Sequence, residues 1–279
     1  MCQLARVSRA GWYRRRRAEP PAGRREVELR DQVQKIALGW PSYGSRRITA
    51  QLRRRGWAVN RKRVQRLMRQ DNLLCLRKRR FVVTTDSDHP WPVYRNLARS
   101  MVLTGTDQLW LADITYIRLL EEFIYLAVIL DAYSRRVIGW ALDRTLEDRL
   151  TLAALRMALA RRVVTPGLVH HSDRGVQYAS TAYTSLLRDH GIQISMSRKA
   201  NPWDNAACES FMKTLKCEEV YRVEYRDLAH ARSRIRAFLE TVYNRQRLHS
   251  ALGYLPPAEF ERDLQGEQNK EAAARQLSL

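Results

Sequence analysis

The order of apolar patterns between residues 106 and 244 constrains the fold of this 279-residue chain more than any other feature. Three runs rich in β-branched and aromatic residues come first, at 108–119, 122–130 and 135–142, with turn residues between them. Short runs of this kind are typical of an antiparallel meander. We therefore expect three consecutive strands that belong to one sheet.

Helical and strand-like patterns alternate after these three runs. In order, they are a helix at 145–162, a strand at 168–172, a helix at 182–189, a strand at 192–196, and helices at 204–219 and 228–244. The residues expected on the buried face of the first helix are Leu146, Leu150, Ala153, Met157 and Ala160. Helices alternating with strands favour an α/β core around a mixed sheet, β-β-β-α-β-α-β-α, over residues 105–262. A polar tail at 263–279 is expected outside this core.

Positive charge is concentrated in the first part of the chain. Residues 1–104 carry 26 Lys and Arg against 7 Asp and Glu, whereas residues 105–279 carry 24 against 22. A basic half joined to a near-neutral half is typical of a polyanion-binding module attached to another domain. The longest apolar runs fall far short of the roughly 20 residues that a membrane-spanning helix needs. Nucleic acid is therefore the expected partner, and no membrane is expected.

The basic half also carries the pattern of a helix-turn-helix. A helix is expected at 26–38, followed by one at 46–55 with Ser45 as N-cap and one at 61–71 with Asn60 as N-cap. A small helical bundle that arginines merely keep soluble is the alternative, but the charge favours DNA binding. The expected DNA-contacting residues here are Arg46, Arg47, Arg61, Lys62 and Arg63. We expect a basic all-α region at 1–76, with the helix-turn-helix at about 45–71, and a linker at 77–104.

Compartment and redox state follow from the cysteines and the N-terminus. The four cysteines form no Cys-x-x-Cys pair, which fits a reducing cytosol better than disulfides or a zinc site. The N-terminus shows no apolar signal segment. We expect a cytoplasmic, nucleoid-associated protein without zinc.

Two aspartates stand at strand-like positions. Asp113 lies inside the apolar run LWLADITYI, where a buried salt bridge to an arginine is the ordinary explanation for a lone acid. Asp173 follows an apolar run and precedes Arg174-Gly175. Strand ends in α/β sheets are common ligand positions, although Asp-Arg-Gly is also ordinary turn chemistry.

A third acid, Glu209, lies in an amphipathic helix. It shares one helical face with Asn205, Lys213 and Lys216, so that the lysines can point towards bound phosphates. A solvated face with Glu–Lys pairing is the alternative. Three carboxylates together suit hard divalent cations, and two such ions supply the charge that phosphodiester chemistry needs. The three acids thus predict phosphoryl transfer on DNA.

Several motifs in fixed order resemble a known family. WLADITYI, HHSDRGVQY and NPWDNAACESF, with 35 residues between the later two acids, resemble the D,D(35)E core of retroviral-integrase-like transposases. YNRQRLHSALGYLPPAEF narrows the resemblance to the second-frame transposase protein of the IS-three group of bacterial insertion sequences. YGSRRITAQL and VNRKRVQRLM resemble the helix-turn-helix of that group. The resemblance extends from about Tyr43 to Phe260.

The resemblance implies an RNase-H-like core in which Asp113, Asp173 and Glu209 bind two Mg²⁺ ions, with Mn²⁺ as a substitute. It implies strand cleavage at transposon ends, followed by attack of the freed 3′-OH on another phosphodiester. The implied partners are double-stranded DNA of the terminal repeats and the target, further copies of the chain, and a first-frame protein or fusion. Ala112 and Cys208 depart from the family pattern, but both are small.

The resemblance also bears on residues around the acids. Lys216 matches the position of a basic residue implicated in DNA contact. Arg247 and His249 belong to the YN–R–H signature, for which DNA contact and helix packing are both open. Asn205 and Tyr178 fall within the motifs without an assigned role.

Two other functions compete with transposition. A structure-specific nuclease on the same fold would cut DNA without joining strands. A catalytically silent DNA-binding regulator would keep the acids for structural reasons only. The products formed on terminal-repeat DNA separate the first alternative from a transposase, and substitution of the three acids separates the second.

Overall fold

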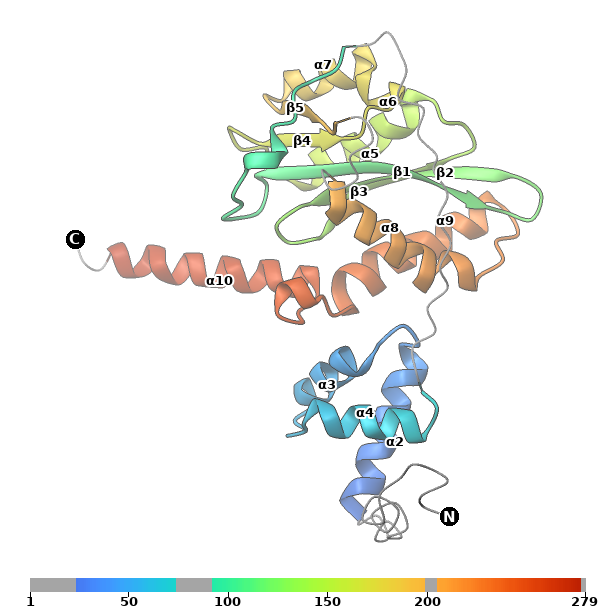
Figure 1. The fold of residues 1–279 in the computed structure, drawn as a ribbon. Helices are drawn as coiled ribbons and strands as arrows, with labels where there is room; N and C mark the ends of the chain where they lie inside the picture. The colour runs from blue at the N-terminus through green and yellow to red at the C-terminus, as the bar shows by residue number, and fades with distance from the viewer. Residues whose placement is uncertain (1–23, 74–91, 199–204, 277–279) are drawn as a thin grey trace, which may run out of the picture. The chain divides into compact units, whose positions relative to one another are not determined.

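The computed structural model describes residues 24–73, 92–198 and 205–276 (Figure 1). The chain divides into two compact units, residues 1–77 and 78–279. Within the described ranges, no helix is both long and apolar enough to cross a membrane.

The described part of the first unit is a set of three helices. They are α2 (Arg24–Gly39), α3 (Ser45–Arg54) and α4 (Arg61–Gln70). Their buried side chains include Leu29, Val33, Ile36, Ile48, Leu52, Val64, Leu67 and Met68. These eight recur at helical spacing, as the inner faces of packed helices do. The helical prediction for this segment is therefore confirmed.

The helix starts of α3 and α4 differ from each other. The Asn60 side chain accepts a hydrogen bond from the backbone N–H of Lys62 at 2.8 Å, as expected of an N-cap. The prediction of Ser45 as N-cap is wrong. Gly44 has the extended backbone of a cap residue, which starts the helix one residue earlier, and it makes no side-chain cap hydrogen bond. Gly56, with φ +83°, ends the turn after α3 in a conformation that glycine adopts readily.

Replacing Asn60 by alanine removes the cap of α4. We expect Asn60→Ala to destabilise this helix by about 1 kcal/mol, because the N–H of Lys62 loses its side-chain acceptor in the first turn. Amide hydrogen exchange in the full chain measures this as faster exchange in the first turn of α4. The control is Lys62→Ala, which keeps the capped N–H. Equal exchange in Asn60→Ala and the unaltered protein would contradict the role of the cap.

A five-stranded mixed sheet forms the centre of the second unit. Its strands are β1 (Leu109–Arg118), β2 (Phe123–Asp131), β3 (Val137–Asp143), β4 (Val169–Ser172) and β5 (Gln193–Met196). The order is β3-β2-β1-β4-β5. The first three strands pair antiparallel, whereas β4 pairs parallel with β1 and β5. The expected meander and mixed sheet are confirmed.

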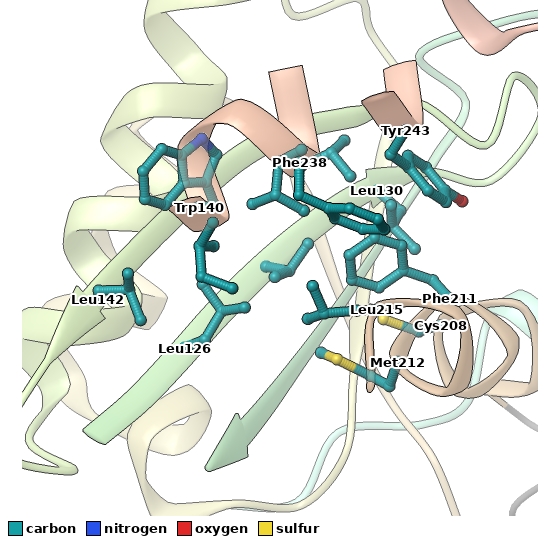
Figure 2. Close-up of a cluster of buried hydrophobic side chains, with 14 of the residues drawn as sticks. Leu126, Leu130, Trp140, Leu142, Cys208, Phe211, Met212, Leu215, Phe238 and Tyr243 are labelled. Atoms are coloured by element: carbon teal, nitrogen blue, oxygen red, sulfur yellow. The ribbon is translucent and has the colours of Figure 1, made fainter. Parts of the chain in front are cut away.

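Helices cover both faces of this sheet (Figure 1). One face carries α5 (Asp148–Arg161), α6 (Val176–Ala179) and α7 (Thr181–Asp189). The other carries α8 (Ala206–Glu218), α9 (Leu228–Ala237) and η4 (Phe238–Gln246). Figure 2 shows the apolar core between the sheet and this second set of helices, where side chains of α8 and η4 contact strand residues such as Leu126 and Leu130. The shorter and terminal helices are η1 (Ala98–Ser100), η3 (Val220–Arg222), η5 (Ser250–Leu252) and α10 (Pro257–Gln276).

The buried face of α5 was predicted only in part. Leu150 is buried and Met157 packs against the core as expected, but Leu146, Ala153 and Ala160 are exposed. The buried residues are Leu150, Thr151, Ala154, Leu155 and Ala158. The reason is a close approach at Gly139 of β3, where a Cβ atom would lie 2.2 Å from the carbonyl oxygen of Ala154. Small residues must face the sheet at such a contact, so Ala154 and Ala158 turn inward.

The helix expected at 228–244 is present, but it changes type within its length. The α-helix α9 ends at Ala237, and the wider π-helix η4 continues directly from it to Gln246. The Asn244 side chain at its end accepts from Val137 N and donates to Val137 O, both at 3.0 Å. This pair of bonds satisfies the backbone at the start of β3. π-Helical segments are rare, and apolar spacing does not predict them.

Of the two segments expected outside the core, the linker differs from the prediction, whereas the tail is helical and its described side chains, 263–270, are almost all exposed. Residues 92–104, expected as linker, pack on the second unit: Leu97 N donates to Ser195 Oγ at 2.8 Å, and Leu97, Met101 and Leu103 contact the core. Their apolar side chains account for this. Residues 263–276, expected as a polar tail, continue α10.

Candidate active site

Asp113 and Asp173 occupy matching positions on neighbouring parallel strands. The β1–β4 register pairs Leu109 with Val169 and Leu111 with His171. Continued by two residues, the same register sets Asp113 opposite Asp173, just past the end of β4 at Ser172. Backbones of paired strands lie about 4.8 Å apart. The two aspartates therefore leave the sheet side by side, where β4 ends and β1 continues.

The electrostatics of Asp113 reflect its burial and the neighbouring acids. Burial, which is the largest cause, and the negative charges of Asp173 and Glu209 together raise the pKa of Asp113 from 3.8 to about 7. The backbone N–H of Ile114, which donates to Asp113 Oδ1 at 2.8 Å, and the ammonium of Lys216 act in the opposite direction. The three acids repel one another, which a cation between them would relieve.

The turn after β4 holds Asp173 in place. Gly175 N donates to Asp173 Oδ1 at 3.0 Å. A Cβ atom on Gly175 would lie 3.1 Å from that same oxygen. Glycine at this position therefore lets the backbone approach the carboxylate closely.

Helix α8 carries Glu209 to the same region. Its apolar side, Cys208, Phe211, Met212 and Leu215, packs on the sheet as expected (Figure 2). Burial raises the pKa of Glu209, although its side chain stays exposed. Burial also raises the pKa of the Cys208 thiol, as do the charges of Asp113, Asp173 and Glu209. The fully buried Cys208 thus lies near all three acids.

The two lysines of α8 differ in their surroundings. Lys216 is partly buried, its Nζ lies 4.8 Å from the centre of the Tyr116 ring, and burial lowers its pKa while Asp113 raises it. Lys213 is exposed. Lys216 therefore borders the acids, whereas Lys213 lies on the open surface of the helix.

Arg247 and His249 are buried. Arg247 is 4% exposed and donates through Nε and Nη2 to the Glu218 carboxylate, both at 2.9 Å. His249 lies edge-on to Tyr243, with ring centres 4.7 Å apart. These positions favour packing over DNA contact, so neither residue enters the DNA-binding surface that we propose below.

The basic residues of the first unit have several environments. Arg46, Arg61 and Lys62 are exposed. Arg47 lies over the Tyr43 ring at 5.5 Å. Arg63 forms an ion pair with Glu26 of α2 at 3.2 Å. Arg63 thus also ties α4 to α2.

Sequence reasoning assigned no role to Tyr178 or Asn205, although both fall within the acid motifs. Tyr178 is 2% exposed, and its hydroxyl has no hydrogen-bond partner in the described part of the chain. Burial raises the pKa of Tyr178, followed by the charges of Tyr183, Asp173 and Asp113. Asn205 is 7% exposed and donates from Nδ2 to Ala112 O at 3.1 Å.

Removal of the Tyr178 hydroxyl tests its burial. We expect Tyr178→Phe to leave the free energy of unfolding unchanged or to raise it by about 1 kcal/mol, because an unpartnered buried hydroxyl is costly. Urea unfolding of the metal-free full chain measures this. The comparison is Tyr183→Phe, which removes a hydroxyl bonded to His170 Nε2 at 2.9 Å and is expected to destabilise. An equal loss of unfolding free energy in both variants would contradict the conclusion that the Tyr178 hydroxyl has no hydrogen-bond partner.

The donor set fits a hard divalent cation. Carboxylate oxygens are the protein ligands that Mg²⁺ prefers, and Mg²⁺ binds through one or two of them, retained waters and substrate phosphates. Among the described residues, no group of three or more His, Cys, Asp or Glu side chains is arranged so that it could hold a metal ion. Asp113, Asp173 and Glu209 therefore supply suitable ligand atoms, but their placement in the structure does not by itself form a metal site.

Models of known families match both units. Residues 104–202 and 190–257 match models described as integrase core domain, and residues 24–81 match one described as HTH-like domain. An integrase catalytic core of RNase-H-like fold, preceded by a helix-turn-helix-like domain, defines a polynucleotidyl transferase that acts on DNA.

Curated relatives narrow this class to one family. The chain is 35% identical over 267 residues to the transposase InsF of insertion sequence IS3A from Escherichia coli K12, covering 94% of this chain and 92% of that protein. It is 40% identical over 263 residues to a 31 kDa protein of insertion element IS600 from Shigella sonnei, covering 93% and 97%. It is 38% identical over 221 residues to the IS904 transposase of Lactococcus lactis, covering 79% and 87%. The chain belongs to the IS3 family of transposases.

Solved structures with similar folds include viral integrases. A simian T-cell lymphotropic virus intasome chain is 13% identical with a TM-score of 0.48, covering 82% of this chain and 74% of that one. The HTLV-2 integrase catalytic core, solved in complex with magnesium, is 15% identical with a TM-score of 0.44, covering 57% and 98%.

Proposed function

We propose that this transposase cuts DNA strands at the ends of its insertion sequence and joins the freed 3′-OH to another phosphodiester. Asp113, Asp173 and Glu209 are the residues that hold two Mg²⁺ ions, or Mn²⁺ in their place. The observation that supports this proposal is the parallel register of β1 and β4, which sets Asp113 opposite Asp173 when it is continued by two residues. When bound, the two ions supply positive charge for the attacking and leaving oxygens.

The chain's own groups have distinct tasks in this reaction. Asp113 lies within β1 and Asp173 directly follows β4, so the sheet holds both carboxylates in fixed positions, whereas Glu209 reaches the site from α8. The negative charges of Asp173 and Glu209 act on Asp113, and a cation held between the acids would offset this repulsion. Lys216, partly buried beside these acids, contacts a DNA phosphate near the reacting bond, and the exposed Lys213 contacts the backbone further along.

DNA ends are bound by the first unit in this proposal. Its exposed cations, Arg46, Arg61 and Lys62, supply phosphate contacts, with Arg47 and Arg63 next to them. Two ends must meet for joining, so the active form is an assembly of several copies on terminal-repeat and target DNA. A first-frame protein or fusion is a further proposed partner. The domain limits proposed are 1–76 for DNA binding and 105–262 for catalysis.

The experiment that tests this function follows both products. Purified full-length protein is incubated with labelled terminal-repeat DNA and Mg²⁺, and cut and joined strands are separated on a gel. We expect free 3′-OH ends and joined products, both abolished by EDTA. Cleavage without any joined product would favour a nuclease. Full transposition in cells by Asp113→Asn, Asp173→Asn and Glu209→Gln variants would establish a silent regulator instead.

A further inference from the structure

The side chain of Asn205 donates a hydrogen bond to β1 at a point where a backbone N–H of β4 would otherwise donate it. Carbonyl groups along a strand point alternately to its two sides. Gln108 O accepts from Val169 N towards β4, while Leu109 O accepts from Ala132 N on the side of β2. Ala112 O therefore faces β4, yet the β1–β4 ladder ends at Leu111. The Nδ2 of Asn205 donates to this carbonyl at 3.1 Å instead.

This bond fixes the direction of the other half of the amide. The Oδ1 of Asn205 is buried and has no hydrogen-bond donor within the described residues. An unsatisfied buried carbonyl costs free energy, and in a native protein it calls for a specific partner. With Nδ2 held by Ala112 O, the amide cannot turn to place its oxygen elsewhere without losing that bond.

The free oxygen lies at the acid site. Ala112 directly precedes Asp113, so Asn205 binds the backbone of β1 beside the first acid, just past the last residue that β1 pairs with β4. Asn205 is the N-cap residue of α8 and stands four residues before Glu209. An oriented acceptor thus lies close to Asp113, at the start of the helix that carries Glu209, and ionised carboxylates cannot donate a hydrogen bond to it.

We infer that Asn205 is a positioning residue whose Oδ1 accepts a hydrogen bond from a water bound to the divalent cation. This inference rests on the proposed function. Mg²⁺ retains several waters, and their protons need acceptors beyond the carboxylate ligands. Groups that orient metal-bound ligands in this way contribute strongly to metal affinity. Asn205 thereby links the edge of β1 to the position of the cation.

Mn²⁺ binding to the full-length protein without DNA tests this inference. Isothermal titration calorimetry gives the Kd for the unaltered protein, Asn205→Ala and Asn205→Asp. We expect Asn205→Ala to weaken Mn²⁺ binding by about 10-fold or more, a usual effect of losing such a group. Asn205→Asp loses the bond to Ala112 O but keeps an oxygen acceptor, so we expect it to bind Mn²⁺ at least as tightly as the unaltered protein.

A matched control and a stability measurement separate binding from folding. Asn96 also has a buried Nδ2 without a partner in the described chain, but its side chain accepts from Arg99 N beside η1. Asn96→Ala should leave the Kd for Mn²⁺ unchanged. Melting temperatures in EDTA report the structural contribution of each asparagine.

The outcomes test two separate claims, the positioning role of Asn205 and the existence of the cation site. If both Asn205 variants have lower melting temperatures but an unchanged Kd for Mn²⁺, Asn205 is purely structural and the inference is overturned. A change in Mn²⁺ binding that is seen only when DNA is present would also overturn it. If Asn205→Ala does not fold, Asn205→Asp decides: retained Mn²⁺ binding supports the inference and a weakened Kd overturns it. Absence of Mn²⁺ binding by the unaltered protein would sink the proposed cation site itself.

Discussion

Glu209→Gln is expected to leave a folded protein that neither cuts nor joins terminal-repeat DNA. We expect the rate to fall at least about 1,000-fold, since a metal ligand supports several kcal/mol of transition-state stabilisation and each 1.36 kcal/mol is tenfold in rate. Glutamine keeps the size of the side chain and removes only its charge. Glu209 is exposed on α8, so its substitution does not disturb the apolar side of that helix.

The measurement is single-turnover cleavage of labelled DNA ends in Mg²⁺, with circular dichroism to confirm folding. Glu224→Gln is the matched control, because it makes the same chemical change at an exposed glutamate in the loop before α9. The control should cleave at the rate of the unaltered protein. Cleavage by Glu209→Gln within tenfold of that rate would remove Glu209 from the proposed set of ligands.

Glu261→Ala is expected to have the largest effect on stability. The Glu261 carboxylate is 5% exposed and bonded to Arg162, Arg136 and Ser134 Oγ, the last at 2.6 Å. Arg162 also pairs with Asp107 at 3.3 Å. Removing one partner of a buried ion pair leaves the other charges uncompensated, which costs about 3–5 kcal/mol. We expect a fall of that size in the free energy of unfolding at pH 7, measured with urea.

This contribution has a defined dependence on pH. Burial alone raises the pKa of Glu261, but the charge of Arg162 and the hydrogen bonds from Ser134, Arg162 and Arg136 outweigh it and hold the pKa below its ordinary value of 4.5. A lowered folded-state pKa stabilises the protein above pH 4.5, and that stabilisation is lost as the pH falls through the folded-state pKa.

The difference between the unaltered protein and Glu261→Ala should therefore be largest near neutral pH and shrink in acid. Urea unfolding across this range measures the difference. Glu267→Ala, an exposed position further along α10, is the control and should change little at any pH. A difference that stays constant below pH 4.5, or one that grows there, would contradict the ion-pair account.

The sequence was sufficient for the sheet because its strands carry strong local signals. Runs of β-branched and aromatic residues predicted β1, β2 and β3, and short apolar runs predicted β4 and β5. The three acids were each ambiguous alone, and only their order pointed to one site. The parallel register of β1 and β4, which brings Asp113 opposite Asp173, depends on long-range pairing that a single strand pattern does not contain.

Other features depended on tertiary contacts that apolar spacing does not reveal. The buried face of α5 is set by the close approach at Gly139, and the π-helix η4 ends with Asn244 on the backbone of Val137. From the sequence, Arg247 is equally suited to DNA contact and to packing, because a sequence motif does not reveal which acidic group an arginine contacts in the fold. Arg247, just past the end of η4, bonds to Glu218, which precedes it by 29 residues and lies at the end of α8.

Asn205 illustrates the same limit within the site. Its position four residues before Glu209 was visible in the sequence, but its bond to Ala112 O requires β4 to end before that carbonyl. The polar residues that surround an acid site are thus harder to find than the acids, since their roles are defined by neighbours distant in the chain.

The central claim is that Asp113, Asp173 and Glu209 jointly hold the cations that act on DNA. Anomalous diffraction from crystals of the protein bound to a terminal-repeat DNA end and Mn²⁺ tests it most directly. The account predicts two Mn²⁺ peaks about 3.5–4 Å apart, both contacted by these carboxylates and by the scissile phosphate. Carboxylates more than about 10 Å apart, with no Mn²⁺ between them, would contradict it.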